Sequence, residues 1–169
     1  MKDKQLMILS FVLPLVIAGA QTLLAAETDT FAEMVGHYER IRQALLQDTS
    51  DGVADHATAI EEIAEGLTQD LDAGRAGVEE SKVSEVADLL PDLQQAAAGL
   101  ATAEGIDAAR EALSQLTKPL VRYRALVEGD RPVVAYCPMA NKAWLQPAGE
   151  IGNPYYGQSM ARCGEIVSE

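Results

Sequence analysis

Apolar residues recur along the first two thirds of the chain at the three- and four-residue spacing of amphipathic helices. The first such stretch begins at Thr30, which forms a capping-box pair with Glu33, so Thr30 is expected to be the N-cap residue. Its apolar positions are Met34, Tyr38, Ile41 and Leu45. A polar turn cluster at 48–52 ends the stretch, so the pattern predicts a helix from about residue 30 to residue 45.

Three further helical stretches follow, separated by breaks at Gly74, Gly77 and Gly105. Their apolar faces are Ala57, Ile60, Ile63, Ala64, Leu67 and Leu71; Val83, Val86, Leu89, Leu90, Leu93 and Ala97; and Ile106, Ala109, Leu113, Leu116, Leu120 and Tyr123. Pro91 and Pro119 fall inside the third and fourth stretches and are expected to kink or split them. Four amphipathic segments with short connections predict an all-α fold, an antiparallel bundle of roughly four helices over 27–130.

Helical periodicity stops near Arg131, and frequent Pro and Gly residues make 131–169 loop-rich. The residues at 133–136 leave room for one short strand. This segment contains the single Trp and both Cys of the chain. Side chains of this kind favour packing, so we expect the segment to fold onto the bundle as part of the same domain.

The N-terminus has the pattern of an export signal. Lys2 and Lys4 precede an apolar run at 6–18, and Ala18-Gly19-Ala20 fits a small-x-small cleavage site. The pattern predicts a signal peptide at 1–20, with cleavage after Ala26 as the alternative. We therefore expect a periplasmic protein without a membrane span after cleavage, in an oxidising compartment. An uncleaved membrane anchor is the competing interpretation.

Composition and charge restrict the function. The chain has 169 residues, 48% of them hydrophobic, and a net charge of −13. These values are typical of a folded domain and argue against nucleic-acid binding, which needs clustered Lys and Arg. Known catalytic motifs are absent, and no His neighbours either Cys in sequence, so we do not expect an enzyme. His37 and His56 are each expected to be solvated or packed helical residues.

The candidate chemistry lies in the last 33 residues. Cys137 and Met139 are two positions apart, and Met160 and Cys163 are three apart. Thiolate and thioether are soft ligands that select Cu(I), so these four residues are a candidate metal site. The alternative is a structural disulfide between Cys137 and Cys163, closing a loop of about 27 residues, with both Met side chains packed in the fold. The sequence leaves both interpretations open.

The order of motifs in this segment resembles an exported bacterial helical domain of unknown function. That family also occurs as a C-terminal module on periplasmic adaptor subunits of heavy-metal efflux pumps of the resistance–nodulation–division class. The matching residues are Cys137, Pro138 and Met139; Trp144 and Leu145; Asn153, Pro154, Tyr155, Tyr156 and Gly157; and Met160, Cys163 and Gly164. The resemblance implies a periplasmic protein linked to copper-type metals, with an adaptor or another efflux component as partner.

Two functional hypotheses follow from the sequence. The first is a periplasmic helical module that binds or senses copper-type soft metals and is associated with heavy-metal efflux. The second is a non-catalytic structural or interaction domain of the cell envelope, whose C-terminal segment is held by the disulfide.

Overall fold

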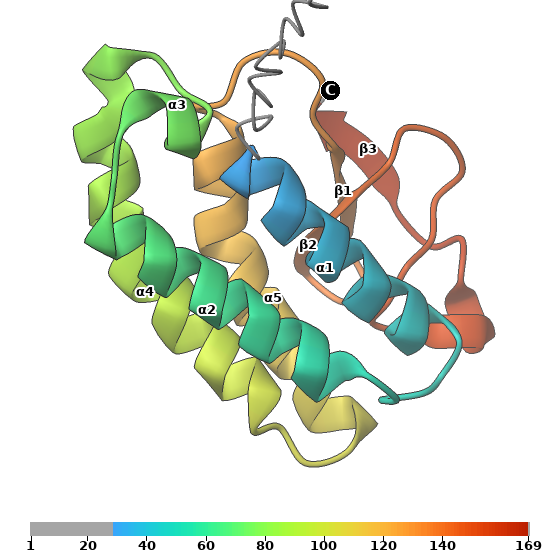
Figure 1. Ribbon diagram of the computed structural model, residues 1–169. Coiled ribbons are helices and arrows are strands. Elements are labelled where there is room, and N and C mark those ends of the chain that lie inside the picture. The colour runs from blue at the N-terminus through green and yellow to red at the C-terminus, as the bar shows by residue number, and fades with distance from the viewer. Residues whose placement is uncertain (1–28, 169) are drawn as a thin grey trace, which may run out of the picture.

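The computed structural model describes residues 29–168, so the predicted signal peptide and both cleavage sites lie outside the described part. Within it the chain is mostly helical, and a small sheet follows the helices (Figure 1). The α-helices are α1 (Thr30–Leu46), α2 (Val53–Gln69), α3 (Ala73–Ala76), α4 (Val83–Ala101) and α5 (Ile106–Arg124). The strands are β1 (Val133–Cys137), β2 (Lys142–Gln146) and β3 (Glu165–Ser168), and two 3₁₀ turns lie at Glu80–Lys82 and Gly157–Met160.

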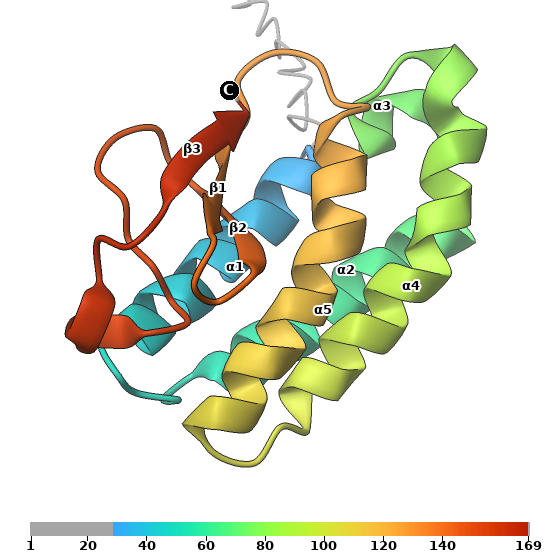
Figure 2. The same cartoon turned by 180° about the vertical axis from the view of Figure 1, so that it is seen from behind.

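The four long helices pack as a bundle, as the apolar spacing predicts. Helix α2 packs against α1 and α4, and α4 packs against α5. The sheet lies on the α1 and α5 side, where β2 contacts both helices (Figure 2). The buried apolar side chains other than Val133, from Phe31 in α1 to Tyr155 in the loop between β2 and β3, belong to one connected core.

The start of α1 differs from the predicted one. The N-cap residue is Asp29, whose carboxylate accepts the backbone N–H groups of Phe31 and Ala32 at 3.1 and 3.2 Å. Thr30 is instead the first helical residue and is buried. A carboxylate satisfies the free amides of the first turn and also complements the positive end of the helix dipole.

Neither internal proline splits its helix. Helix α4 continues through Pro91, and α5 continues through Pro119. A proline removes one intrahelical hydrogen bond, but tertiary packing supplies most helical stability in proteins. Leu89, Leu90 and Leu93 around Pro91 are all buried, so packing holds this part of α4 in place.

The expectation of an all-α fold with at most one strand is wrong in the C-terminal segment. The predicted strand at 133–136 is confirmed as β1, but it is the centre of a three-stranded antiparallel sheet in the order β2-β1-β3. Strand β2 returns after a four-residue turn in which Asn141 takes the left-handed φ of 52° that Asn tolerates. Strand β3 is exposed along its whole length, so no buried alternation marks it in the sequence.

The sheet is joined to the helices by buried polar contacts as well as by apolar packing. The hydroxyl of Tyr38 in α1 lies 2.7 Å from the Thr117 hydroxyl in α5 and accepts the Leu145 backbone N–H of β2 at 3.3 Å. Burial raises the pKa of Tyr38 to about 12, so it stays a neutral phenol. One hydroxyl therefore connects two helices and the sheet.

Candidate functional site

The two cysteines lie side by side. Cys137 is the last residue of β1, pairs with Lys142 of β2 and is completely buried. Cys163 lies just before β3 and is partly exposed. Both are free thiols, and their Sγ atoms are 2.9 Å apart.

Gly164 makes this approach possible. Its φ of 141° suits glycine, and a Cβ there would lie 2.6 Å from the Trp144 ring and 3.0 Å from the Tyr136 carbonyl oxygen. Any other residue would displace the backbone that carries Cys163. Gly164 thus helps to position the Cys163 sulfur, because a residue without a side chain lets the backbone pass close to the Trp144 ring.

Asn153 connects the two chain segments around the thiols. This residue is fully buried, and its side-chain amide donates to the Cys163 carbonyl oxygen at 2.8 Å. Its side-chain oxygen accepts the Tyr155 N–H at 2.8 Å, and its own backbone N–H donates to the Ala161 carbonyl oxygen at 2.8 Å. These bonds use both ends of the side chain to fix the loop beneath Cys163.

The surroundings of the two thiols favour one thiolate. Burial acts to raise the pKa of Cys137, but hydrogen bonds from Cys163, from the backbone N–H groups of Ala140 and Met139, and from the Asn153 side chain outweigh it. The pKa of Cys137 is therefore lowered. The hydrogen bond to Cys137, burial and the charge on Cys137 together raise the pKa of Cys163. The pair thus loses its first proton easily and its second with difficulty, as a Cys163 thiol that donates to a Cys137 thiolate would.

The two predicted thioether ligands differ from the cysteines in exposure. Met139 lies in the turn after β1 and is 65% exposed, so it is not packed in the core. Met160 ends the 3₁₀ turn and is partly buried, and its carbonyl oxygen accepts the Cys163 N–H at 3.0 Å. The structure therefore places the two thiols in contact, whereas each Met is a neighbour of a Cys along the chain. Within residues 29–168 no group of three or more His, Cys, Asp or Glu side chains could hold a metal ion, around the thiols or away from them.

Most of the remaining motif residues build the scaffold around this pair. The indole N–H of Trp144 donates to the Gln146 side chain at 2.8 Å, and the Trp144 ring meets Tyr155 edge-on at 6.1 Å between centroids. The Tyr155 hydroxyl donates to the Ala143 carbonyl oxygen at 2.6 Å. Pro138 is exposed in the turn after Cys137, whereas Tyr156 packs partly against the core.

Two arginines that the sequence patterns did not single out hold the loop between β2 and β3. Arg42 of α1 is 4% exposed, binds both carboxylate oxygens of Glu39 at 2.7 Å and donates to the Gly152 carbonyl oxygen at 2.6 Å. Its position next to the apolar stripe of α1, four residues after Tyr38, is the signal that could have revealed it. A side chain at Gly152 would collide with this guanidinium.

Arg110 of α5 makes the second attachment. It donates to the Pro154 carbonyl oxygen at 2.8 Å, the Leu45 carbonyl oxygen at 3.0 Å and Asp48 at 2.6 Å. Asp48 in turn accepts the Gln158 backbone N–H at 3.0 Å. The Arg110 hydrogen bond and then the Gln158 N–H lower the pKa of Asp48, so this carboxylate stays ionised.

His37 and His56 also meet, contrary to the expectation of two separate helical residues. Their Nδ1 atoms are 3.0 Å apart across α1 and α2. No local signal reveals such a pair, because the two residues are 19 positions apart on different helices.

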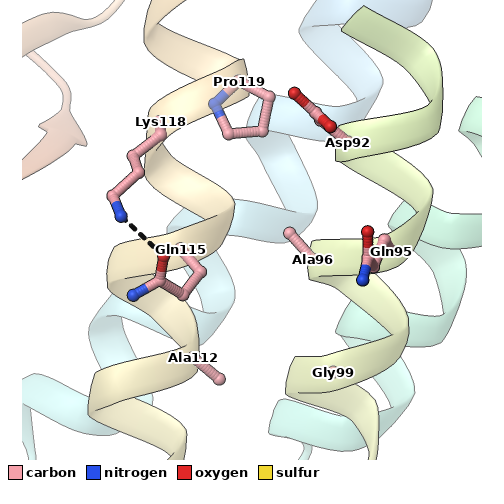
Figure 3. A pocket seen from close by; sticks show the side chains of 8 residues that line it. All are labelled: Asp92, Gln95, Ala96, Gly99, Ala112, Gln115, Lys118 and Pro119. Carbon is pink, nitrogen blue, oxygen red and sulfur yellow. Dashed lines mark hydrogen bonds between the residues drawn. The ribbon is translucent and has the colours of Figure 1, made fainter.

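A shallow groove of about 430 Å³ lies between α4 and α5 (Figure 3). Small residues line its walls at Ala96, Gly99 and Ala112, and Lys118 at its edge donates to Gln115 at 2.6 Å. Figure 3 shows no sulfur among these side chains, so the groove is separate in chemistry from the thiol pair.

Comparison with known proteins identifies no relative. No family model, no curated protein and no solved structure matches this chain. The resemblance of the C-terminal motifs to the exported helical family stays a prediction. None of the helices in the described part of the chain is both long and apolar enough to span a bilayer.

Proposed function

We propose that this chain is a periplasmic helical module that binds or senses copper-type soft metals through Cys137 and Cys163, in association with heavy-metal efflux. The observation that carries the proposal is the pair of unbonded sulfurs 2.9 Å apart, in surroundings whose hydrogen-bond donors lower the pKa of Cys137. Such donors stabilise an anionic thiolate, which is the form that binds a metal. The neutral sulfur of a disulfide gains much less from them.

The donor set fits a soft monovalent ion. Cys137 and Cys163 would hold it, and Met139 and Met160 lie in the adjoining turns as neutral thioether donors. When bound, Cu(I) would be selected by these polarisable sulfurs over hard cations. Asn153 would position Cys163 through its carbonyl, as outer-shell residues do in metal sites.

Location and partner rest on the sequence. The signal-peptide pattern supports the periplasm, and the motif resemblance supports an efflux adaptor or another efflux component as partner. Copper in that compartment would meet this protein as cargo or signal, and no catalytic step is part of the proposal.

The test is Cu(I) competition against a coloured chelator, with the full chain kept reduced. We expect one Cu(I) per chain, and Cys137→Ser or Cys163→Ser should abolish competition. Met139→Leu combined with Met160→Leu removes both thioethers at nearly constant volume and should weaken binding by about tenfold or more. Copper loading should also protect both cysteines from alkylation. Unchanged alkylation rates at every stoichiometry would refute the metal role.

The second candidate is the disulfide-stabilised interaction domain, favoured by the same contact between the sulfurs. In this case air oxidation should form the Cys137–Cys163 bond and raise the unfolding free energy by about 3.5 kcal/mol on the chain-entropy estimate. The double Met→Leu variant should then differ little from the wild type in any copper assay. A reduced chain that competes for Cu(I) would exclude this candidate as the whole function.

A further inference from the structure

The clustered histidines of α1 and α2 form a second, chemically different pair of metal-binding groups. The Nδ1 atoms of His37 and His56 are 3.0 Å apart, the ring centroids are 5.2 Å apart, and the ring planes are inclined at 59°. Two neutral imidazoles at this distance share one proton, because one Nδ1 donates and the other accepts. The accepting lone pair and the shared proton therefore point into the same small space.

The distance between the nitrogens suits a chelate. Two nitrogens bound to one ion at about 2.0–2.1 Å are about 2.9 Å apart at a right angle and about 3.3 Å apart in a tetrahedron. The observed 3.0 Å lies between these values. A metal would lie to one side of the line between the nitrogens, so each ring must turn by about 35–45° for its Nδ1 lone pair to face the ion that replaces the shared proton.

The helices keep the two rings in place and leave room for an ion. His37 lies in the middle of α1 and His56 in the first turn of α2, and both rings are partly exposed. A Cβ at Gly36 would meet no atom within 4 Å, and one at Gly52 would meet only the His56 ring, at 3.9 Å. The surface at these two glycines, one on α1 and one just before α2, is therefore open.

We propose that His37 and His56 form a two-imidazole site for a divalent first-row metal ion, with Cu(II) as the ion bound most tightly. Imidazole suits Cu, Ni and Zn ions, and Cu(II) leads the affinity order among these at nitrogen sites. Among residues 29–168 no third His, Cys, Asp or Glu completes a cluster here, so water fills the remaining coordination positions. The ion is exchangeable and joins α1 to α2.

This site does not depend on the proposed thiol function, because its ligands are on other elements and prefer the oxidised ion. The experiment uses the full chain with Cys137→Ser and Cys163→Ser, so that no thiol can reduce Cu(II). Circular dichroism first checks that this background keeps its helical content. Cu(II) chloride is then titrated in the presence of glycine, which competes against weak binding to the acidic surface.

The chain has only two His residues, so imidazole signals are assigned without ambiguity. We expect one equivalent of Cu(II), with an electron paramagnetic resonance spectrum whose nitrogen couplings change when histidine is labelled with ¹⁵N. His37→Gln and His56→Gln should each weaken binding by about tenfold or more, since even outer-shell changes cost 10–100-fold. Glu33→Gln, one turn before His37 on α1, is the matched control and should leave the affinity unchanged.

Two results would overturn the site. Couplings that do not respond to ¹⁵N-histidine would place the ion on the N-terminal amine or on carboxylates. An affinity in both His→Gln variants equal to that of the chain with both histidines would leave the pair as a hydrogen-bonded contact between α1 and α2. The labelling experiment needs no substitution at either His, so it decides the matter even if a His→Gln variant fails to fold.

Discussion

The helical part of the chain and its C-terminal segment share one core, but different forces hold them. In the helices, apolar side chains such as Leu67, Leu93 and Leu113 are completely buried, while the backbone satisfies its own hydrogen bonds. The loop from Pro147 to Gly164 lacks such a backbone ladder, and helix side chains satisfy two of its carbonyls instead, at Gly152 and Pro154. Irregular backbone near a core thus depends on polar groups supplied from elsewhere in the sequence.

The largest expected effects come from truncating one buried side chain to Ala in each region. Leu93→Ala should cost about 2–5 kcal/mol of unfolding free energy, and Trp144→Ala about 3–5 kcal/mol. Trp144→Ala should also speed alkylation of the reduced thiols without denaturant, because the indole covers Gly164 beside Cys163. Urea unfolding followed by circular dichroism gives the stabilities. If Leu93→Ala speeds alkylation of the thiols as much as Trp144→Ala does when the two variants are equally stable, the indole does not shield the thiols specifically.

The next largest effect is expected from removing the Arg42 side chain, which attaches the C-terminal loop to α1. Arg42→Met leaves the Gly152 carbonyl without its donor and Glu39 without its ion-pair partner, and should cost about 1–3 kcal/mol. Hydrogen exchange should rise first around Gly152 and in β2 while α4 stays protected. Arg40→Met, on the exposed side of α1, is the matched control and should change stability by less than about 0.5 kcal/mol. Uniform loss of protection in both regions would show that the attachment is not local.

Substitutions at two glycines distinguish the cost of backbone strain from the cost of disturbing the contact between Asp48 and Arg110. Gly129 and Gly157 both have positive φ, 83° and 52°, but only a side chain at Gly157 would strike Asp48 and Arg110. Gly129→Ala should therefore cost about 1–2 kcal/mol for the left-handed conformation alone. Gly157→Ala should cost more, because the contact between Asp48 and Arg110 must also shift. Equal values in thermal unfolding would argue against a role for this contact.

The smallest effect is the pH dependence of the reduced protein. The lowered pKa of Cys137 adds stability as pH rises through that pKa towards the ordinary thiol value of about 8.5. The raised pKa of Cys163 removes stability above about 8.5, because the unfolded thiol ionises first. Urea unfolding between pH 6 and 10 should therefore show a maximum near pH 8.5. The variant with both cysteines changed to Ser should lack it.

The two regions also differ in how far the sequence predicts them. The helices of the bundle follow from apolar spacing, since each turn repeats the pattern and errors are confined to ends such as Asp29 and Thr30. Both hypotheses for the cysteines, the metal site and the disulfide, require Cys137 and Cys163 to lie close together. Strand β3 could not be predicted, because its exposed residues have no buried face. The contacts of Arg42 and His37 depend on residues on other elements, which local patterns do not encode.

The attachment of the C-terminal loop to α1 affects the order in which contacts can form while the chain is synthesised. Arg42 and its acceptor Gly152 are 110 residues apart. At a synthesis rate of 5–20 residues per second, roughly 5–20 s pass between their appearance. During that interval the Arg42 guanidinium has Glu39 as its partner but not the Gly152 carbonyl, and α1 lacks the sheet that covers it. Helix α1, the first helix within residues 29–168, is therefore among the last to complete its contacts, and a chain cut short before Gly152 cannot finish the fold.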